Sequence, residues 1–388
     1  MNKMYKPEDY RDFAHTGPHT LAGKFLRSFW QPITKSEELE TGRPKRVHIL
    51  NEYFTAYRGE DGKAYVVQDE CPHRLTRLSL GWIEEDGIRC FYHGWKFAGG
   101  DGQCTHQPAE PDSYKKAIKI AAYPVREYLG LVFVYFGEGQ TPEFPLYPEV
   151  DLEKDTVFCS AHPVPCNYYQ RIENDLDEVH LHFVHRVSTA SIGLDQLPEI
   201  QVEESDYGIL RRGHRVNSDN NVSRTGHIFM PNTMLVFTPG RPGRWAWNLH
   251  LAWRVPIDDQ TMMSFVVNAH LGEGKGFQKR DRHPNPDPQV YIDKILNCEM
   301  RVQDIDPEYP ALFQVQDGVA LAGQGAMVDR NRERLGQSDR GIILMRKLWS
   351  RELQAIAEGR PLKAWKRPKE SLLDLNSREV QLASTRIS

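Results

Sequence analysis

Two short arms of potential metal ligands place the strongest constraint on how this chain can fold. The order is C-x-H, sixteen residues, then C-x-x-H, with Cys71 and His73 in the first arm and Cys90 and His93 in the second. Zinc fingers usually take two cysteines from one arm and two cysteines or histidines from the other. Here each arm supplies one cysteine and one histidine, which favours a two-iron cluster over zinc. The two arms must therefore fold back on one another to meet at a single metal group.

A [2Fe–2S] cluster fits these four side chains when both cysteines bind one iron and both histidines bind the other. Neutral imidazoles in place of two thiolates make such a cluster less negative and raise its reduction potential, which is typical of a Rieske centre. We therefore expect a redox cluster that passes single electrons, with the ligands Cys71, His73, Cys90 and His93.

Composition excludes several classes of protein. The 388 residues carry 26% charged side chains and a net charge of -4, without a long basic run that would favour nucleic-acid binding. No stretch approaches the roughly 18 apolar residues of a transmembrane helix. The start, "MNKMYKPEDYRDF", lacks the apolar region of a secretory signal. Six cysteines in a chain of this length do not indicate a disulfide scaffold, so we expect a cytoplasmic protein.

Strand and helix patterns predict an α+β chain of two domains. Short β-rich segments run from about residue 46 to "GLVFVYFG" at 130–137, and a segment rich in proline and acidic residues follows. This predicts an all-β unit at 25–140, a second domain at 141–365 and a polar tail at 366–388. In the second domain, 167–185 and 338–359 are expected helices. The strand 244–253 alternates Trp245, Trp247, Leu249, Leu251 and Trp253 with Ala246, Asn248 and His250.

A second metal motif lies in the expected helix 167–185. Asp177, His180 and His185 form a D-x-x-H-x4-H pattern, and two histidines with one carboxylate are typical of non-haem Fe(II) oxygenases. His185 is five residues beyond His180, about 140° around an ideal helix. The helix must therefore end, kink or bulge between these two histidines. His182 is the alternative ligand, although it lies on the opposite face from His180.

The motifs resemble those of one family. The arms "CPHR" and "CFYHGWKF", with "LSLGWI" between them, are similar to the Rieske domain of ring-hydroxylating, non-haem iron oxygenase α subunits. The second motif matches that family's N-x-x-D-x-x-H-x4-H pattern at Asn174, Asp177, His180 and His185. The resemblance implies a helix-grip, START-like catalytic domain in which an antiparallel sheet wraps around helices. One departure is Leu75, Thr76 and Arg77, where the family commonly has small residues.

The resemblance also changes the role of the aspartate. It implies that Asp177 is a catalytic residue that carries electrons from the Rieske histidine of a neighbouring subunit, with Asn174 supporting it. The iron's carboxylate must then come from the late chain, which offers Asp304, Asp306, Asp317, Asp329 and Asp339. The segment "DRNRERLGQSDRGIILMRKL" implies Asp339, and "QDGVALAGQGAMVDR" is similar to the phthalate-dioxygenase-like branch. An ordinary helix-start charge is the alternative for Asp339. Glu173, Asp175 and Glu178 are expected to be solvated.

The implied function is that of a terminal oxygenase component. It would use O2 and electrons from an NAD(P)H-dependent reductase, with or without a ferredoxin, to hydroxylate or O-demethylate an aromatic, carboxylated small molecule. The chain has no G-x-G-x-x-G or flavin motif, so a separate donor is needed. The family implies a homotrimer. A substrate carboxylate could meet Arg211, Arg212, Arg241 or Arg244, although solvent exposure is the alternative for each. The alternatives for the whole chain are an electron-transfer Rieske protein without oxygenase activity and a zinc-stabilised structural protein.

Overall fold

The computed structural model describes residues 5–186, 196–216, 221–239, 247–279 and 285–372. The chain divides into two compact units. The first comprises His15–Pro145 and Val255–Asp258, and the second comprises Met1–Ala14, Leu146–Arg254 and Asp259–Ser388. The division after Pro145 falls in the segment rich in proline and acidic residues that the sequence predicts as a boundary.

The N-terminal segment belongs to the second unit, which the sequence-based bounds did not anticipate. The ring of Phe13 stacks on Tyr169 with centroids 4.7 Å apart. The Phe13 carbonyl accepts a hydrogen bond of 2.6 Å from the Tyr168 hydroxyl. Because both contacts are buried, the residues before His15 add to the core of the second unit.

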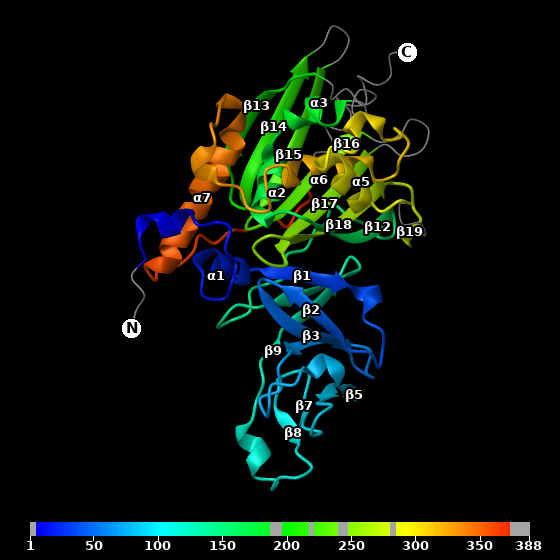
Figure 1. The fold of residues 1–388 in the computed structure, drawn as a ribbon, viewed down its shortest axis with the longest axis vertical. Coiled ribbons are helices and arrows are strands. Elements are labelled where there is room, and N and C mark those ends of the chain that lie inside the picture. Colours follow the sequence, from blue (N-terminus) through cyan, green and yellow to red (C-terminus); the bar gives the residue numbers. More distant parts are fainter. Residues whose placement is uncertain (1–4, 187–195, 217–220, 240–246, 280–284, 373–388) are drawn as a thin grey trace. The chain divides into compact units, whose positions relative to one another are not determined.

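Three small sheets form the first unit (Figure 1). They follow a short helix, α1 (Leu21–Arg27). One sheet has the order β1-β11-β10, with β1 at Trp30–Lys35, β10 at Val125–Tyr128 and β11 at Leu131–Tyr135. The second has the order β2-β3-β4-β9, with β2 at Lys45–Ile49, β3 at Glu52–Arg58, β4 at Ala64–Gln68 and β9 at Ala122–Tyr123. The third has the order β5-β6-β7-β8, with β5 at Trp82–Glu84, β6 at Gly87–Arg89, β7 at Lys96–Phe97 and β8 at Cys104–His106.

An eight-stranded sheet forms the frame of the second unit. Its order is β13-β14-β15-β16-β17-β18-β12-β19, and β12 and β19 pair in parallel. The register of β12 against β18 and of β13 through β17 is antiparallel, which is the arrangement expected from the alternating sequence. The bounds are β12 Thr156–Val164, β13 Glu199–Glu204, β14 Gly208–Val216, β15 Asn221–Phe229, β16 Thr233–Pro239, β17 Trp247–Pro256, β18 Met262–Leu271 and β19 Gly276–Gln278.

Helices cover one face of this sheet, as Figure 1 shows for α2 and α6. The helix α2 contacts α6 and α7, α6 contacts α5, and α7 contacts β13 and β14. Their bounds are α2 Tyr168–Leu176, α3 His180–Phe183, α5 Pro288–Leu296, α6 Leu312–Ala322 and α7 Arg340–Ala357. The α+β class with an antiparallel sheet gripping helices is confirmed.

The acidic residues of α2 are buried in ion pairs, and the expectation that they are solvated is wrong. Asp175 pairs with Arg254 of β17 at 2.7 Å, and both side chains are almost fully buried. Glu173 pairs with Arg330 at 2.9 Å and with Arg346 of α7 at 2.6 Å. Asp175 also lies 3.6 Å from Arg171, four positions away, but the other cationic partners lie 79 to 173 positions away along the chain, where sequence pattern alone gives no indication of them.

Glu178 follows α2 and is the most enclosed of these carboxylates. It is 0% exposed and contacts three arginines of neighbouring strands, including Arg211 and Arg215 at 2.8 Å each and Arg224. Gly213 lies beneath it, and a Cβ there would approach the Glu178 carboxylate to 2.8 Å. The strand therefore needs a glycine at this position to admit a buried charge. Burial raises the pKa of Glu178, but the three arginines outweigh the effect of burial and lower that pKa to about 2.

The opposite face of the sheet holds the aromatic core. Trp253 is fully buried and packs edge-on against Tyr147, with ring centroids 5.4 Å apart. Leu249 and Leu251 share this face, so the hydrophobic stripe of the strand is core and does not face the helices. Trp245 and Ala246 of the predicted strand lie outside the described residues.

The start of the predicted tail is held against this outer core. The guanidinium of Arg367 lies 4.6 Å from the Tyr147 ring centroid and pairs with Glu149, whose side chain is fully buried. The Glu149 carboxylate also accepts a hydrogen bond of 2.7 Å from the Leu372 backbone. Residues 366–372 are therefore anchored, and the remainder of the predicted tail, 373–388, lies outside the described residues.

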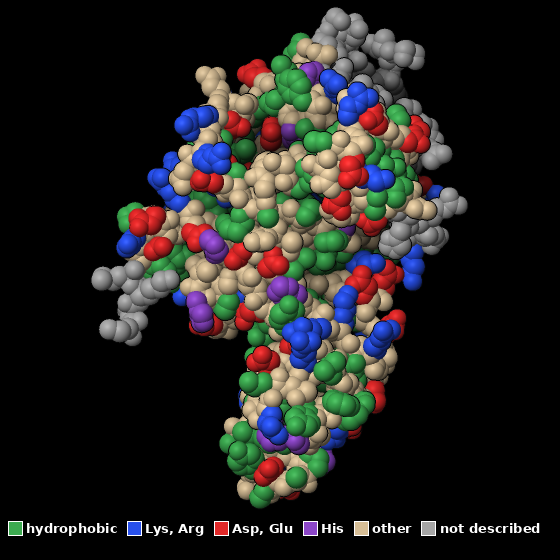
Figure 2. Space-filling view, viewed as in Figure 1, with side chains coloured by type: hydrophobic (Ala, Val, Ile, Leu, Met, Phe, Trp, Pro, Cys, Tyr) green, Lys and Arg blue, Asp and Glu red, His purple; other side chains and the backbone are tan. Residues whose placement is uncertain are grey.

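Charges are mixed on the visible surface. Figure 2 shows acidic and basic side chains interspersed on the face in view, without a large area of one sign. No helix among the described residues is long and apolar enough to cross a membrane.

The buried carboxylate predicts a large effect on stability. Glu178→Gln leaves three arginines without their counter-charge and should lower the free energy of unfolding by about 3–5 kcal/mol. Glu203→Gln is the matched control, because its pair with Arg212 is exposed and should contribute less than about 1 kcal/mol. Urea unfolding at pH 7 measures both changes.

The difference in stability between the wild type and Glu178→Gln should depend on pH. The folded pKa of Glu178 is about 2, below the ordinary value of 4.5, so its charge stabilises the fold fully above about pH 5. That contribution is lost as pH falls toward 2. The gap between wild type and Glu178→Gln should therefore narrow on acidification, and a gap that widens would contradict the proposed role of the carboxylate.

Candidate metal centres

The two arms of the first motif have the same backbone course. In the first arm, the Cys71 amide donates to the Thr76 carbonyl and the Leu75 amide donates to the Cys71 carbonyl, both at 2.9 Å. In the second, the Cys90 amide donates to the Trp95 carbonyl at 2.8 Å and the Gly94 amide to the Cys90 carbonyl at 3.0 Å. Each arm is thus a closed turn that begins at its cysteine.

Equivalent positions of the two turns adopt a left-handed backbone. Gly94 has a φ of 73° and Leu75 a φ of 61°. Glycine adopts this conformation without cost, whereas leucine does so at about 1–2 kcal/mol. The departure from the family pattern noted at Leu75 therefore falls on a strained position, and the side chain of Leu75 is 65% exposed.

The cysteines and histidines separate into an inner and an outer pair. Cys71 and Cys90 are buried, in a core cluster with Leu78, Ile88 and Phe97. The rings of His73 and His93 are 4.4 Å apart between centroids, and His93 is exposed. Trp95 stacks on His73 at 4.5 Å with 9° between the planes, which fixes the imidazole.

This arrangement fits a cluster with one iron inside and one outside. The Nδ1 atom of His73 is buried without a hydrogen-bond partner, which suits a nitrogen that binds metal. The thiols of Cys71 and Cys90 share a hydrogen bond, which lowers the pKa of Cys90 to about 6 and raises that of Cys71. Cys90 therefore ionises more readily than Cys71.

Charged side chains anchor each arm. Asp69 precedes the first arm, is buried, and pairs with Arg46 at 2.6 Å while accepting a hydrogen bond from Thr55. Arg89 precedes Cys90 and binds Glu84 through two hydrogen bonds of 2.6 Å. Arg89 also donates to the Gly94 carbonyl, so it clamps the turn of the second arm.

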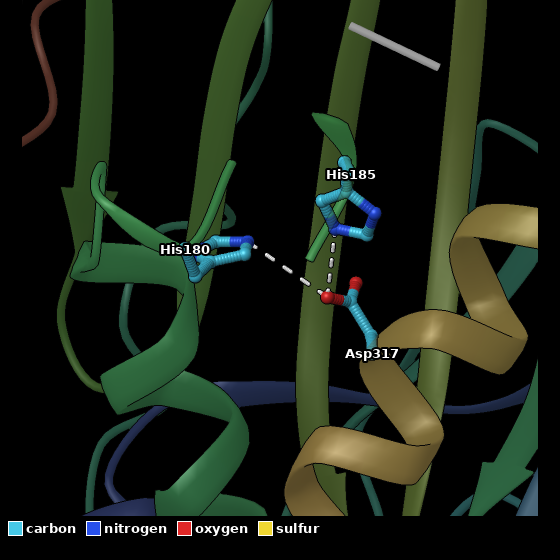
Figure 3. Close-up of side chains that lie close together, drawn as sticks. All are labelled: His180, His185 and Asp317. Carbon is cyan, nitrogen blue, oxygen red and sulfur yellow. Dashed lines mark hydrogen bonds and ion pairs between the residues drawn. The ribbon is translucent and has the colours of Figure 1, made fainter. Parts of the chain in front are cut away.

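The second centre consists of His180, His185 and Asp317. One nitrogen or oxygen atom of each lies within 4.8 Å of the others, and no other such group of three occurs in the described chain. Figure 3 shows both imidazoles turned toward the Asp317 carboxylate. Its Oδ1 atom lies 3.0 Å from His185 Nε2 and 3.8 Å from His180 Nε2. Two imidazoles and one carboxylate around one point form the donor set of a non-haem Fe(II) site.

The expected single helix at 167–185 is two helices with a break. The helix α2 ends at Leu176, and α3 contains only His180–Phe183. Asp177 has an extended backbone, and its Oδ1 atom accepts hydrogen bonds from Val179 at 2.7 Å and His180 at 3.2 Å. The chain then turns after Phe183, so the predicted interruption between the two histidines is present. The two rings consequently meet, with centroids 5.3 Å apart.

Neighbouring side chains orient the three ligands. Gln316 precedes Asp317 and its Oε1 atom lies 2.8 Å from His185 Nδ1, which directs Nε2 toward the carboxylate. Arg171 of α2 donates to the other oxygen of Asp317 at 2.7 Å. Burial raises the pKa of Asp317, but Arg171 and the histidines outweigh it and hold that pKa well below its usual range. The carboxylate is therefore ionised at neutral pH.

Three other predicted residues surround this group. Asn174 accepts a hydrogen bond from Arg171, which places it one contact from Asp317. The Oδ2 atom of Asp177 lies 3.9 Å from His180 Nδ1, a buried atom without a hydrogen-bond partner. His182 instead contacts Phe183 and is not part of the metal group. These contacts favour His180 over His182 as the ligand.

The described side chains favour Asp317 over the predicted Asp339 as the third ligand. Asp339 lies at the start of α7, where its carboxylate accepts a hydrogen bond of 2.6 Å from the Gly336 backbone. It is thus an ordinary helix-start charge, the alternative considered above. Asp317 lies on α6, whose remaining residues are mostly apolar, "LFQVQDGVALA". A lone carboxylate on an apolar helix is the sequence signal that identifies it.

Comparison with known proteins identifies the family. Residues 29–126 match the Rieske [2Fe-2S] domain. The chain is also 32% identical over 378 residues to the 5,5'-dehydrodivanillate O-demethylase oxygenase subunit of Sphingobium sp. (strain NBRC 103272 / SYK-6), covering 93% of this chain and 83% of that relative. This chain belongs to the Rieske non-haem iron oxygenases. The oxygenase is 28% identical to the phthalate 4,5-dioxygenase oxygenase subunit of Pseudomonas putida, over 92% and 88% of the two chains.

Solved structures agree with this fold. The Rieske oxygenase superposes on dicamba monooxygenase bound to dicamba with a TM-score of 0.64 and 21% identity, covering 86% of this chain and 99% of that one. NdmA of Pseudomonas putida CBB5 gives a TM-score of 0.66 and 19% identity, covering 86% and 92%. The resemblance to oxygenase α subunits of the phthalate-dioxygenase-like branch is confirmed, and the cofactors of the oxygenase are a [2Fe–2S] cluster and a mononuclear iron.

The assignment of the third ligand can be tested by iron content. Asp317→Ala should reduce the iron from about three atoms per chain to about two, because only the cluster irons remain. The visible spectrum of the cluster should not change. Asp339→Ala is the control and should retain all the iron. An Asp317→Ala protein with full iron content, or its loss in Asp339→Ala, would reverse the assignment.

The contact of Gln316 with His185 predicts a weaker effect on the same iron. Gln316→Leu removes the acceptor that fixes the imidazole and should lower the affinity for Fe(II) by about 10- to 100-fold. Gln314→Leu is the matched control, since Gln314 lies on the same helix two residues before Gln316, about 200° away around the helix axis. Titration of the iron-depleted protein with Fe(II) distinguishes the two variants.

Proposed function

We propose that this oxygenase introduces oxygen from O2 into an aromatic small molecule, by hydroxylation or by O-demethylation. The observation that carries the proposal is the pairing of His180 and His185 with a single ionised carboxylate, Asp317. Such a donor set leaves about three coordination positions for O2 and water, so a substrate can react without binding the metal.

The bound iron would supply O2 activation, and the protein residues prepare the site for it. His180 is a neutral donor, because burial lowers its pKa against the effect of Asp317. Arg171 keeps Asp317 ionised and holds its second oxygen, so the carboxylate presents one oxygen to the metal position. Gln316 sets the tautomer of His185. The three ligands are therefore prearranged before metal binds.

Electrons reach this site one at a time from the cluster. Its proposed ligands are Cys71, His73, Cys90 and His93, with the histidines on the outer side. Asp177 lies beside His180 Nδ1 and is partly exposed, which suits a residue that links His180 to a donor outside its own unit. We propose that this donor is the histidine edge of another subunit in a homotrimer.

A separate protein supplies the electrons. The exposed surface near His93 carries apolar side chains that a partner could cover, including Trp82 and Phe91 with ring centroids 5.7 Å apart and 51% and 57% exposure. We propose an NAD(P)H-dependent reductase, with or without a ferredoxin, as the partner, and a cytoplasmic location for the complex.

The names of similar proteins support an aromatic substrate. Relatives are named for O-demethylation of 5,5'-dehydrodivanillate and for dioxygenation of phenoxybenzoate and of phthalate. Demethylation of an aryl methyl ether consumes O2, two electrons and two protons, and yields a phenol, formaldehyde and water. Hydroxylation uses the same electrons and the same metal sites, so both reactions suit the geometry.

The predicted carboxylate-binding arginines receive less support. Arg211 is buried and engaged by Glu178, and Arg212 forms an exposed pair with Glu203. Arg241 and Arg244 lie outside the described residues. Arg211 and Arg212 therefore give no support for a carboxylate on the substrate.

The alternative, an electron-transfer protein without its own oxygenase activity, predicts no mononuclear iron and no product. The test supplies the protein with a surrogate reductase, NADH, O2 and a panel of methoxylated and unsubstituted aromatics. We expect one oxidised product whose formation requires the mononuclear iron. Isotopic O2 then shows how many oxygen atoms enter it. Cluster reduction and reoxidation without any product would favour the alternative.

Asp177 gives a sharper prediction about the electron path. Asp177→Asn should retain the cluster spectrum and the full iron content but slow product formation by about 100-fold or more, because the link at His180 is broken. Asp304→Asn is the control, since Asp304 forms a surface pair with Arg301. Rapid mixing with O2 and substrate should leave the cluster of Asp177→Asn reduced. Normal turnover by this variant would exclude Asp177 from the path.

A further inference from the structure

The sheet presents polar side chains to the helices that carry the mononuclear site. On β17, His250 and Arg254 lie on one face, and on β18 Ser264 and Asn268 lie on the same face. His250 Nδ1 lies 2.9 Å from Asn268 Oδ1, and Arg254 donates to Ser264. Arg254 also pairs with Asp175 of α2, so this is the face that α2 covers.

This polar face lies opposite the metal group. Asp175, which binds the sheet, and Arg171, which binds Asp317, are one turn apart on α2. Figure 3 shows strands of the sheet running behind His180, His185 and Asp317. The side chains of His250 and Asn268 are only half-buried, whereas Leu249, Leu251 and Val267 on the reverse face are fully buried. The protein therefore leaves part of each polar side chain uncovered, and a small molecule can hydrogen-bond to it.

The two arginines of this face and of α2 that lie between the pair and the metal group already have counter-charges. Arg254 is paired with Asp175, and Arg171 is paired with Asp317. Burial lowers the pKa of His250 to about 4, aided by the charge of Arg254. The imidazole is therefore neutral at pH 7, and the pair with Asn268 is polar without a charge.

A neutral pair of this kind offers both a donor and an acceptor. With Nδ1–H donated to the Asn268 oxygen, His250 retains a bare Nε2 acceptor and Asn268 retains its N–H donors. With the amide turned the other way, the imidazole offers a donor and the amide oxygen an acceptor. In either orientation the complementary ligand group must donate one hydrogen bond and accept another. A phenolic hydroxyl does both, whereas a carboxylate only accepts and a methyl ether only accepts.

We propose that His250 and Asn268 are specificity-determining residues that bind an un-ionised hydroxyl on the aromatic substrate. The inference rests on the proposed function and adds the substrate class, a phenol that carries the reacting group elsewhere on its ring. An arginine-bound carboxylate is not needed for orientation. The hydroxyl would turn the ring so that its other substituents point to His180, His185 and Asp317.

The test is equilibrium binding to the holoenzyme without a reductase, so that no turnover occurs. The probes are 2-methoxyphenol, 1,2-dimethoxybenzene and 2-methoxybenzoate, measured by calorimetry under nitrogen at pH 7. We expect 2-methoxyphenol to bind about 10- to 100-fold more tightly than either analogue, because each analogue leaves one buried polar group unpaired. Equal affinities for the three probes would overturn the proposal.

Variants identify the residues responsible. His250→Phe and Asn268→Leu should bind 2-methoxyphenol and the two analogues with about equal affinity. His250→Gln keeps a neutral donor and acceptor and should retain part of the preference for 2-methoxyphenol. His270→Asn is the matched control, since His270 is two residues beyond Asn268 on the same face and pairs with Glu273. It should keep the full preference. An unchanged preference in the folded His250→Gln and Asn268→Leu proteins would also overturn the proposal.

Failure of this inference can be separated from failure of the proposed function. If the phenol is preferred but no aromatic is oxidised when reductase and O2 are added, the proposed function is wrong and the binding site stands. If aromatics are oxidised but the phenol is bound no better than its methyl ether, the function stands and His250 and Asn268 do not select a hydroxyl.

Discussion

The mononuclear site depends on the buried ion pairs that fix α2 between the sheet and its neighbouring helices. Asp175 binds Arg254 of the sheet, Glu173 binds Arg346 of α7, and Arg171 binds Asp317 of α6. Removing one partner from such a pair leaves an uncompensated buried charge at a cost of several kcal/mol. The helix therefore cannot slide or rotate without breaking several of these contacts together. This rigidity is what a metal site needs, since its ligands come from two helices and a connecting segment.

The same constraint explains the break at Asp177. Glu178 pairs with arginines of the sheet. A continuous helix could not place the Glu178 carboxylate there while Asp177 accepts hydrogen bonds from the following amides. The chain leaves the helix for three residues, and α3 restarts at His180. The single helix expected at 167–185 is thus interrupted before His180, but the side chains of Asp177 and His180 still meet, because the capping carboxylate lies beside the first residue of the new helix.

Local patterns in the sequence predicted the parts of the site that local geometry determines. Cys71 and Cys90 begin matched turns, so the spacing of these cysteines and of His73 and His93 was sufficient to indicate a cluster. The two histidines of the second motif are also close in sequence, so their spacing indicated a shared metal. Asp317 was one of the candidate carboxylates but was not chosen over Asp339, because its partners lie 132 or more positions away and sequence spacing carries no information about that contact. The solvated interpretation of Glu173, Asp175 and Glu178 failed for the same reason. A charge on a helix can be assigned to solvent or to a pair only when the strand or helix facing it is known.

The sheet has its apolar face away from the helices and its polar face toward the metal group, and this arrangement connects the fold to the chemistry. Trp253 and its apolar neighbours form core on the face away from the helices, while the face toward the metal carries Arg254, His250 and Asn268. Replacing buried ion pairs with well-packed apolar residues is often neutral or stabilising, so the polar face is not explained by stability. Arg254 of this face pairs with Asp175, Asp175 also pairs with Arg171, and Arg171 keeps Asp317 ionised, so the polar face supports the metal group through α2. Once charges on this face are paired, the remaining neutral groups can select a ligand by hydrogen bonding, and a ligand lacking either a donor or an acceptor would leave a buried group unsatisfied.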